Sequence, residues 1–201
     1  EAGLARPTDV GRIEAAREAV AGRRPDIDPD LLGFLADLLG LRLPDRRPLE
    51  DEWVMRFQQL TSPAMAKGVE DTAFYRYNRF VALNEVGGAP DRFGVSPAEF
   101  HARAAARDAA TPATMTTLST HDTKRSEDVR ARLAVLSELT AEWGAFLRTA
   151  SARHPLPSPS LELLAWQSVL GAWPITEERL AGYLTKASKE AKLVTAHVDA
   201  V

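Results

Sequence analysis

At several places along the chain a residue that can cap a helix stands directly before a proline, among them Asp28-Pro29, Ser62-Pro63 and Ser96-Pro97. An Asp or Ser side chain accepts a hydrogen bond from a free N–H group of the first helical turn. Proline fits the first helical position because its missing N–H would have no partner there. The pattern predicts helices that begin at residues 29, 63 and 97, and Glu99 completes a capping box for the third. A chain punctuated in this way is expected to be mainly α-helical.

Apolar residues at helical spacing extend this prediction along the rest of the chain. One helix is expected after Asp9, the helix that begins at Pro29 is expected to end at Gly40, and another is expected around 53–60. The helix that begins at Pro97 should run to about 108, and further helices are expected at 127 to about 139, after Thr140, at 160–170 and at 177 to about 196. A proline-rich stretch at 154–159 is the best internal linker candidate.

One short segment, 114–118, is rich in β-branched residues and predicts a strand. A single strand leaves its own hydrogen-bonding edges unpaired. Either the segment is not a strand, or its partner strands belong to another part of a longer polypeptide. The chain also lacks an initiator Met, so we expect it to be either processed or cut from something longer.

Composition excludes several classes of protein. Apolar residues make up 45% and charged residues 26%, the balance of a folded domain. The absence of cysteine excludes disulfides and thiolate metal sites, and no pattern suggests a metal or other cofactor. A net charge of −3 argues against nucleic acid as a partner, and no apolar run could span a membrane. With no leader pattern, we expect a cytoplasmic protein.

The first chemically rich cluster covers residues 119–128, directly after the strand candidate. In barrels of alternating strands and helices, catalytic groups follow the C-terminal ends of strands. There Asp122 could stabilise a cationic sugar centre, and His121 could bind a sugar hydroxyl. The alternative is an ordinary loop in which Asp122 forms a turn and the next charges, Lys124 and Arg125, are solvated.

The second cluster covers residues 65–77. A helix would place Lys67, Glu70 and Asp71 on one face, and Tyr75 belongs to an aromatic group of the kind that stacks on sugar rings. The alternative is a plain ion-pair face beside an aromatic core.

Three stretches closely resemble the maltooligosyltrehalose synthases of the α-amylase superfamily. They are 58–77 (QQLTSPAMAKGVEDTAFYRY), 83–88 (LNEVGG) and 119–133 (STHDTKRSEDVRARL), with a weaker similarity at 186–192. The resemblance implies a helical insert plus a partial (β/α)8 barrel segment of a larger enzyme. We expect the insert at 1–60, the barrel segment at 61–150 and a C-terminal helical segment at 151–201.

The family is an isomerase that converts the reducing-end α-1,4 linkage of maltodextrins to an α,α-1,1 linkage by intramolecular transglycosylation. The resemblance implies that Asp122 stabilises the transition state and that His121 helps to hold the sugar. The nucleophile and the general acid are expected outside this chain, in the remainder of the parent polypeptide, so we expect the chain alone to be inactive. The further residues expected to contact the maltooligosaccharide are Lys67, Glu70, Asp71, Tyr75, Lys124 and Arg125.

Two expectations for arginines remain open from the residues alone. Arg125 could pair with Glu127 or Asp128 and orient its loop, and Arg76 could pair with Glu70 or Asp71.

A non-catalytic helical module that binds maltodextrin or a partner protein is the alternative function. Convergence of Lys67, Glu70, Tyr75, His121 and Asp122 on one open cleft would favour the enzyme. Their scatter over a closed bundle would favour the module.

Overall fold

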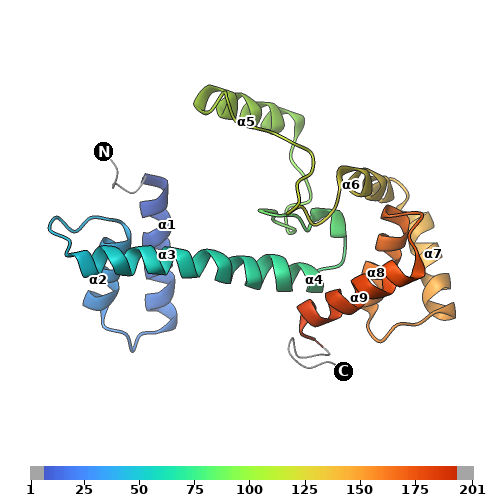
Figure 1. Cartoon of the computed structure of the whole chain (residues 1–201), viewed down its shortest axis with the longest axis horizontal. Helices are drawn as coiled ribbons and strands as arrows, with labels where there is room; N and C mark the ends of the chain where they lie inside the picture. The colour runs from blue at the N-terminus through green and yellow to red at the C-terminus, as the bar shows by residue number, and fades with distance from the viewer. Residues whose placement is uncertain (1–6, 194–201) are drawn as a thin grey trace. The chain divides into compact units, whose positions relative to one another are not determined.

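The computed structural model describes residues 7–193, which form helices joined by loops (Figure 1). The elements are α1 (Pro7–Arg23), α2 (Pro29–Leu39), α3 (Pro48–Gly68), η1 (Val69–Ala73), α4 (Phe74–Arg76), η2 (Val81–Leu83), α5 (Pro97–Ala110), α6 (Glu127–Ala134), η3 (Val135–Ser137), α7 (Thr140–Arg153), α8 (Pro159–Gly171) and α9 (Glu177–Ala191). The prediction of a mainly helical chain is confirmed. Across 7–193, no helix is long and apolar enough to cross a membrane.

Two of the three predicted helix starts are confirmed. The side chain of Asp28 accepts a hydrogen bond from Asp30 N at 2.9 Å, and α2 begins at the proline between them. Ser96 Oγ accepts from Glu99 N at 3.2 Å at the start of α5. The last helix, α9, ends at Ala191, and the final residues predicted for it, 194–196, lie outside the described residues.

The predicted helix start at Ser62-Pro63 is wrong, because α3 runs through it. A proline inside a helix removes the hydrogen bond to the carbonyl four residues earlier, here that of Gln59. Residues 59–63 are all exposed, so water can solvate this carbonyl. Thr61 Oγ1 also donates to Phe57 O at 2.9 Å, which adds a local contact to the same turn.

The predicted strand at 114–118 is absent, and no strand occurs anywhere in the part of the chain that the structure describes. Met115 is 96% exposed, and the hydroxyls of Thr114 and Thr117 bond to nearby backbone carbonyls instead. A strand needs a neighbour for its backbone N–H and C=O groups, and this segment has none within 7–193.

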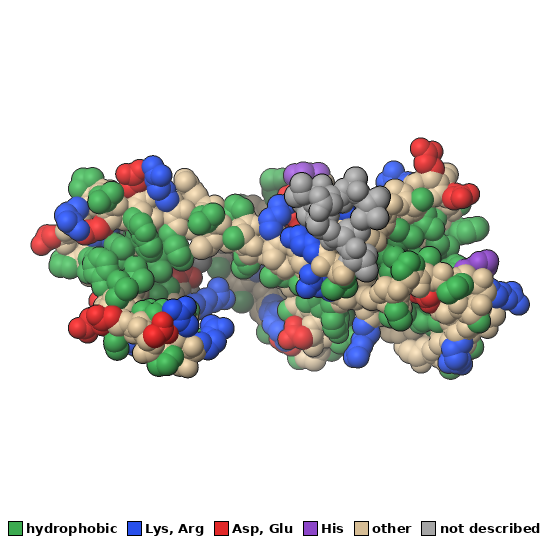
Figure 2. Space-filling view, turned by 90° about the horizontal axis from the view of Figure 1, so that it is seen from below, with side chains coloured by type: hydrophobic (Ala, Val, Ile, Leu, Met, Phe, Trp, Pro, Cys, Tyr) green, Lys and Arg blue, Asp and Glu red, His purple; other side chains and the backbone are tan. Residues whose placement is uncertain are grey.

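The chain divides into two compact units, residues 1–64 and 65–201. The first contains α1, α2 and most of α3. Among the residues of this unit that the structure describes, the buried apolar side chains are Ala36, Leu38 and Val54. Trp53 stacks on Phe57 with ring centroids 5.3 Å apart, yet both remain more than a third exposed. Figure 2 shows hydrophobic side chains on the surface of both units, with basic and acidic ones interspersed.

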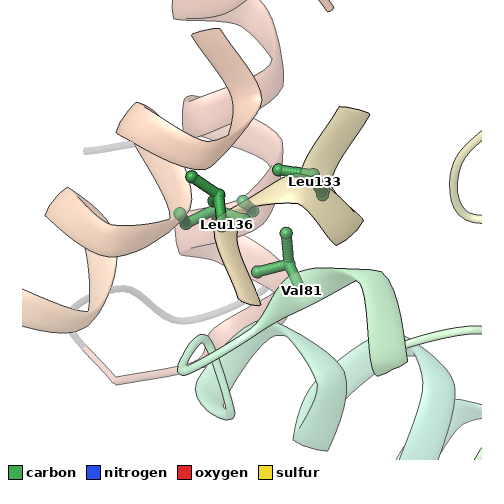
Figure 3. Packing of buried hydrophobic residues seen from close by; sticks show 5 residues of the cluster. Val81, Leu133 and Leu136 are labelled. Carbon is green, nitrogen blue, oxygen red and sulfur yellow. The ribbon is translucent and has the colours of Figure 1, made fainter. Parts of the chain in front are cut away.

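The second unit has the larger core. Val81 of η2 packs with Leu133 of α6 and Leu136 of η3, and Leu164 and Ala187 complete the cluster (Figure 3). Val81 and Leu133 have no exposed surface. The core therefore fixes the irregular segment after α4 against the helices that close the chain.

A buried glutamine reinforces this attachment. Gln167 of α8 is 1% exposed. Its Oε1 accepts from Val81 N at 2.9 Å, and its Nε2 donates to Asn78 O at 2.9 Å. These two backbone groups lie outside regular helices, so the side chain supplies partners that secondary structure does not.

Candidate functional site

The helix that leads into the second unit contains a π-helical turn. α3 continues directly into η1 and α4, and Thr72 Oγ1 donates to Lys67 O at 2.8 Å. Such turns inside α-helices are frequent at functional sites. Asp71 lies in this turn, and its Oδ2 forms an ion pair with Nζ of Lys67, four residues earlier in α3.

Asp71 bridges two lysines from distant parts of the sequence. Its Oδ1 accepts from Lys124 Nζ at 3.0 Å, while Oδ2 binds Lys67. The hydrogen bonds from Lys67 and then Lys124 lower the pKa of the Asp71 carboxyl, and the same bond raises the pKa of Lys67. Near neutral pH, two ammonium groups therefore surround one carboxylate. Because Lys67 is 75% exposed, its remaining donors face solvent.

Four of the predicted site residues, Glu70, Tyr75, Lys124 and Arg125, share one small cavity. It has a volume of about 10 Å³, room for about one water molecule. Phe74, Asn84 and Tyr183 complete its lining. Burial raises the pKa of Tyr75 to about 12, so its hydroxyl is neutral and can both donate and accept hydrogen bonds.

The two arginine pairings considered from sequence are wrong. Arg125 donates to Val81 O at 3.1 Å and to Tyr183 OH at 3.0 Å, so it ties its loop to the core and to α9. Arg76 donates to Ala191 O at 2.6 Å, at the end of α9. The acceptors of both arginines include backbone carbonyls, which every residue has, so the sequence does not indicate which carbonyl an arginine will bind. The prediction considered only nearby carboxylates.

His121 and Asp122 lie apart from that cavity, on the loop before α6. Their side chains are 91% and 75% exposed, with His121 Nε2 3.6 Å from Asp122 Oδ2. The backbone N–H of Asp122 donates to Thr120 Oγ1 at 3.2 Å. Asp71 thus brings Lys67 and Lys124 together, and Glu70, Tyr75, Lys124 and Arg125 share the cavity. The His-Asp pair faces solvent instead. Within 7–193, no three His, Asp or Glu side chains could hold a metal ion.

Sequence reasoning missed Glu85 as a member of this region. Its carboxylate accepts from Lys124 N at 2.8 Å, Arg125 N at 3.3 Å and the Arg130 guanidinium at 3.2 Å. Glu85 belongs to the 83–88 stretch that carries the resemblance, and two residues after it come two glycines, which are also typical of an ordinary helix end. Tyr183, which meets Arg125 from a helix 58 residues away, gave no local signal.

The comparisons with known proteins point to one kind of enzyme. The chain is 51% identical over 147 residues to a maltooligosyl trehalose synthase of Mycobacterium tuberculosis (strain CDC 1551 / Oshkosh). This stretch covers 70% of the chain and 19% of the relative, so the chain spans about a fifth of the curated relatives that it matches. No family model matches the chain.

Solved structures agree with the sequence match. A mutant maltooligosyltrehalose synthase from Arthrobacter ramosus superposes with a TM-score of 0.83 at 40% identity, covering 96% of this chain and 24% of that one. A hypothetical maltooligosyl trehalose synthase from Sulfolobus tokodaii gives a TM-score of 0.63 at 26% identity, covering 94% and 29%.

Fold and sequence together relate the chain to one part of a larger enzyme family. The chain is a homologue of part of the maltooligosyltrehalose synthases, and the resemblance predicted from its motifs is confirmed.

Proposed function

We propose that this chain is an internal segment of a cytoplasmic maltooligosyltrehalose synthase, which converts the reducing-end α-1,4 linkage of a maltodextrin to an α,α-1,1 linkage. The 51% identity to a synthase over 147 residues carries the proposal. Residues 1–60 form a helical insert, 61–150 part of a (β/α)8 barrel, and 151–201 a C-terminal helical segment. Because residues 7–193 contain no strand, the remainder of the parent polypeptide supplies the barrel strands.

Asp122 provides the carboxylate that stabilises the oxocarbenium-like transition state. A retaining glycoside mechanism also needs a nucleophile and a general acid about 5 Å apart, and both come from the remainder of the parent polypeptide. The exposure of the Asp122 side chain supports this role, because the carboxylate is free to meet a sugar. His121, beside it, binds a hydroxyl of the same sugar.

The side chains around Asp71, including Lys67 and Lys124, form a wall for the maltooligosaccharide. Exposed donors on Lys67 suit the hydroxyls of a glucose unit, since charged donors make the stronger hydrogen bonds. Asp71 and Glu70 accept from hydroxyls, Tyr75 supplies a ring and a neutral hydroxyl, and Lys124 and Arg125 complete the wall from the His-Asp loop.

The role of Asp122 is tested in the intact synthase that carries this sequence. We expect Asp122→Asn to lower the rate of trehalose-terminated product formation from maltopentaose by at least about 10³-fold, because a preorganised charge at the reacting centre is lost. Asp128→Asn removes a carboxylate that is also exposed, from the first turn of α6, and should leave the rate unchanged. Near-normal turnover by Asp122→Asn would reject the role.

The chain by itself should be inactive. Glycoside chemistry of this type requires paired carboxylates, and we expect the partners of Asp122 elsewhere. The purified 201-residue chain, incubated with maltopentaose, should yield no trehalose-terminated product. A measurable yield would place the whole catalytic set within these residues.

An apolar groove favours a second candidate, a module that binds maltodextrin or a partner protein. The groove has a volume of about 330 Å³ and is lined mainly by apolar side chains of α7 and α8 and the segments beside them: Leu136, Leu139, Trp143, Phe146, Trp166, Val169, Leu170 and Trp173, with Glu142. Titration of the chain with maltoheptaose distinguishes the binding module from the enzyme segment. A tryptophan fluorescence change that Trp143→Ala abolishes and Asp122→Asn preserves supports the module.

A further inference from the structure

The loop that carries His121 and Asp122 is shaped by short-range hydrogen bonds, and Ser119 Oγ at its start accepts from Glu127 N at 2.9 Å. Within it, Thr123 Oγ1 donates to Thr120 O at 2.7 Å, and Thr120 Oγ1 accepts from Asp122 N at 3.2 Å. It forms no helix or strand between α5 and α6. Contacts with other parts of the second unit then act on the loop backbone directly after the His-Asp pair.

Glu85 contacts the loop backbone from outside the loop, in addition to the side-chain contacts of Lys124 with Asp71 and of Arg125 with Val81 O and Tyr183 OH. The Glu85 side chain is only 22% exposed, and both of its oxygens are used. Oε1 accepts from Lys124 N at 2.8 Å, and Oε2 accepts from Arg125 N at 3.3 Å. Two successive backbone N–H groups thus bind one carboxylate just after the His-Asp pair, and bonds to an ionised acceptor are stronger than neutral ones.

Arg130 of α6 extends this arrangement to both ends of the loop. Its guanidinium contacts Glu85 Oε2 at 3.2 Å. The same group donates to Arg125 O at 2.6 Å and to Leu118 O. Since Leu118 precedes the His-Asp pair and Arg125 follows it, the Glu85–Arg130 pair holds the two ends of the loop together.

A glycine turn fixes the backbone around Glu85. Gly88 N donates to Glu85 O at 2.7 Å. A Cβ on Gly88 would lie 2.7 Å from Glu85 O and 2.8 Å from Leu83 O, closer than real side chains come to backbone atoms. The turn therefore requires glycine at this position, and it sets where the Glu85 carboxylate can reach.

We infer that Glu85, acting through Arg130 and the backbone N–H groups of Lys124 and Arg125, is the positioning residue for the Asp122 loop. The inference rests on the proposed function of Asp122. Glu85 touches no reacting atom; it sets the place of a carboxylate that must meet the sugar within a fraction of an ångström. A displacement of about 1 Å at such a centre can reduce the rate about 10²-fold.

Steady-state kinetics of the intact synthase test the inference. Gln has one acceptor oxygen, and its NH2 group would face N–H donors, so Glu85→Gln should lower kcat about 10- to 100-fold and leave KM within about 2-fold. Arg130→Gln removes the two carbonyl contacts but keeps the Lys124 bond, and should give a smaller kcat loss of the same kind. Glu99→Gln breaks an exposed carboxylate–arginine cluster on α5 and should change neither constant.

The outcomes separate this inference from the proposed function. If Asp122→Asn abolishes turnover but Glu85→Gln and Arg130→Gln keep normal kcat, Glu85 does not position the loop. If Asp122→Asn itself turns over normally, the proposed function fails instead.

Hydrogen exchange in the 201-residue chain gives a readout independent of activity. The Lys124 and Arg125 amides should exchange at least about 10-fold faster in Glu85→Gln and at the original rate in Glu99→Gln. Unchanged exchange in Glu85→Gln would overturn the inference.

Discussion

Replacing Gln167 by Leu tests how the segment carrying Asn78, Val81 and Asn84 is held to the helices. Leu has nearly the same volume and fits an apolar environment, so packing is largely preserved. The change leaves the Val81 N–H and the Asn78 carbonyl without their partners at 2.9 Å. Leu163 O, the third contact, already lies within α8.

The cost follows from the two orphaned groups. A buried backbone donor or acceptor without a partner costs about 1–3 kcal/mol. Two of them, partly offset by the apolar side chain, give a destabilisation of about 2–4 kcal/mol. For a unit of this size, 1 kcal/mol shifts Tm by about 3 °C, so Tm should fall by about 6–12 °C.

Urea unfolding of the chain, followed by circular dichroism, measures this difference. Gln59→Leu, on an exposed turn of α3, is the matched control and should stay within about 0.5 kcal/mol of the original chain. A Gln167→Leu variant as stable as this control, with the Val81 amide still protected from exchange, would refute the reasoning.

Three further predictions concern charge, ionisation and packing. Asp71→Asn should cost about 1 kcal/mol at pH 7. Since Lys67 and Lys124 lower the pKa of this carboxyl below its ordinary 3.8, the cost is full above about pH 5 and disappears as pH falls through the depressed value; equal stability of the two proteins at pH 7 would contradict the ion-pair bridge. Tyr75 should ionise near pH 12 in an absorbance titration at 295 nm, and Tyr75→Phe should remove that late phase. Gly171→Ala should destabilise the chain by about 1–3 kcal/mol in the same urea assay, because its Cβ would lie 2.8 Å from Val129 Cγ1 where α6 meets α8; an unchanged midpoint would mean that the two helices are not packed as described.

Local chemistry made part of the fold predictable. The caps at Asp28 and Ser96 involve partners two and three residues away, so the sequence window contains the whole interaction. Pro63 failed as a helix start because an exposed turn tolerates the missing bond. The segment 114–118 failed as a strand because strand formation depends on a neighbour, which no local pattern reports.

The candidate site divides in the same way. The Lys67–Asp71 pair was visible as a helical spacing, and the structure places it so. Lys124 reaches Asp71 across 53 residues, and Glu85 reaches the Lys124 amide across 39. Pairings at that separation depend on the tertiary packing of η2, α6 and α9, so spacing along the chain could not have predicted them.

A crystal structure of the intact synthase with a bound maltooligosaccharide tests the central claim most directly. The account predicts that the carboxylate of Asp122 lies about 3–3.5 Å from the glucose unit at the bond that is cleaved. A carboxylate packed beneath other side chains, or one turned away from every sugar, would contradict it.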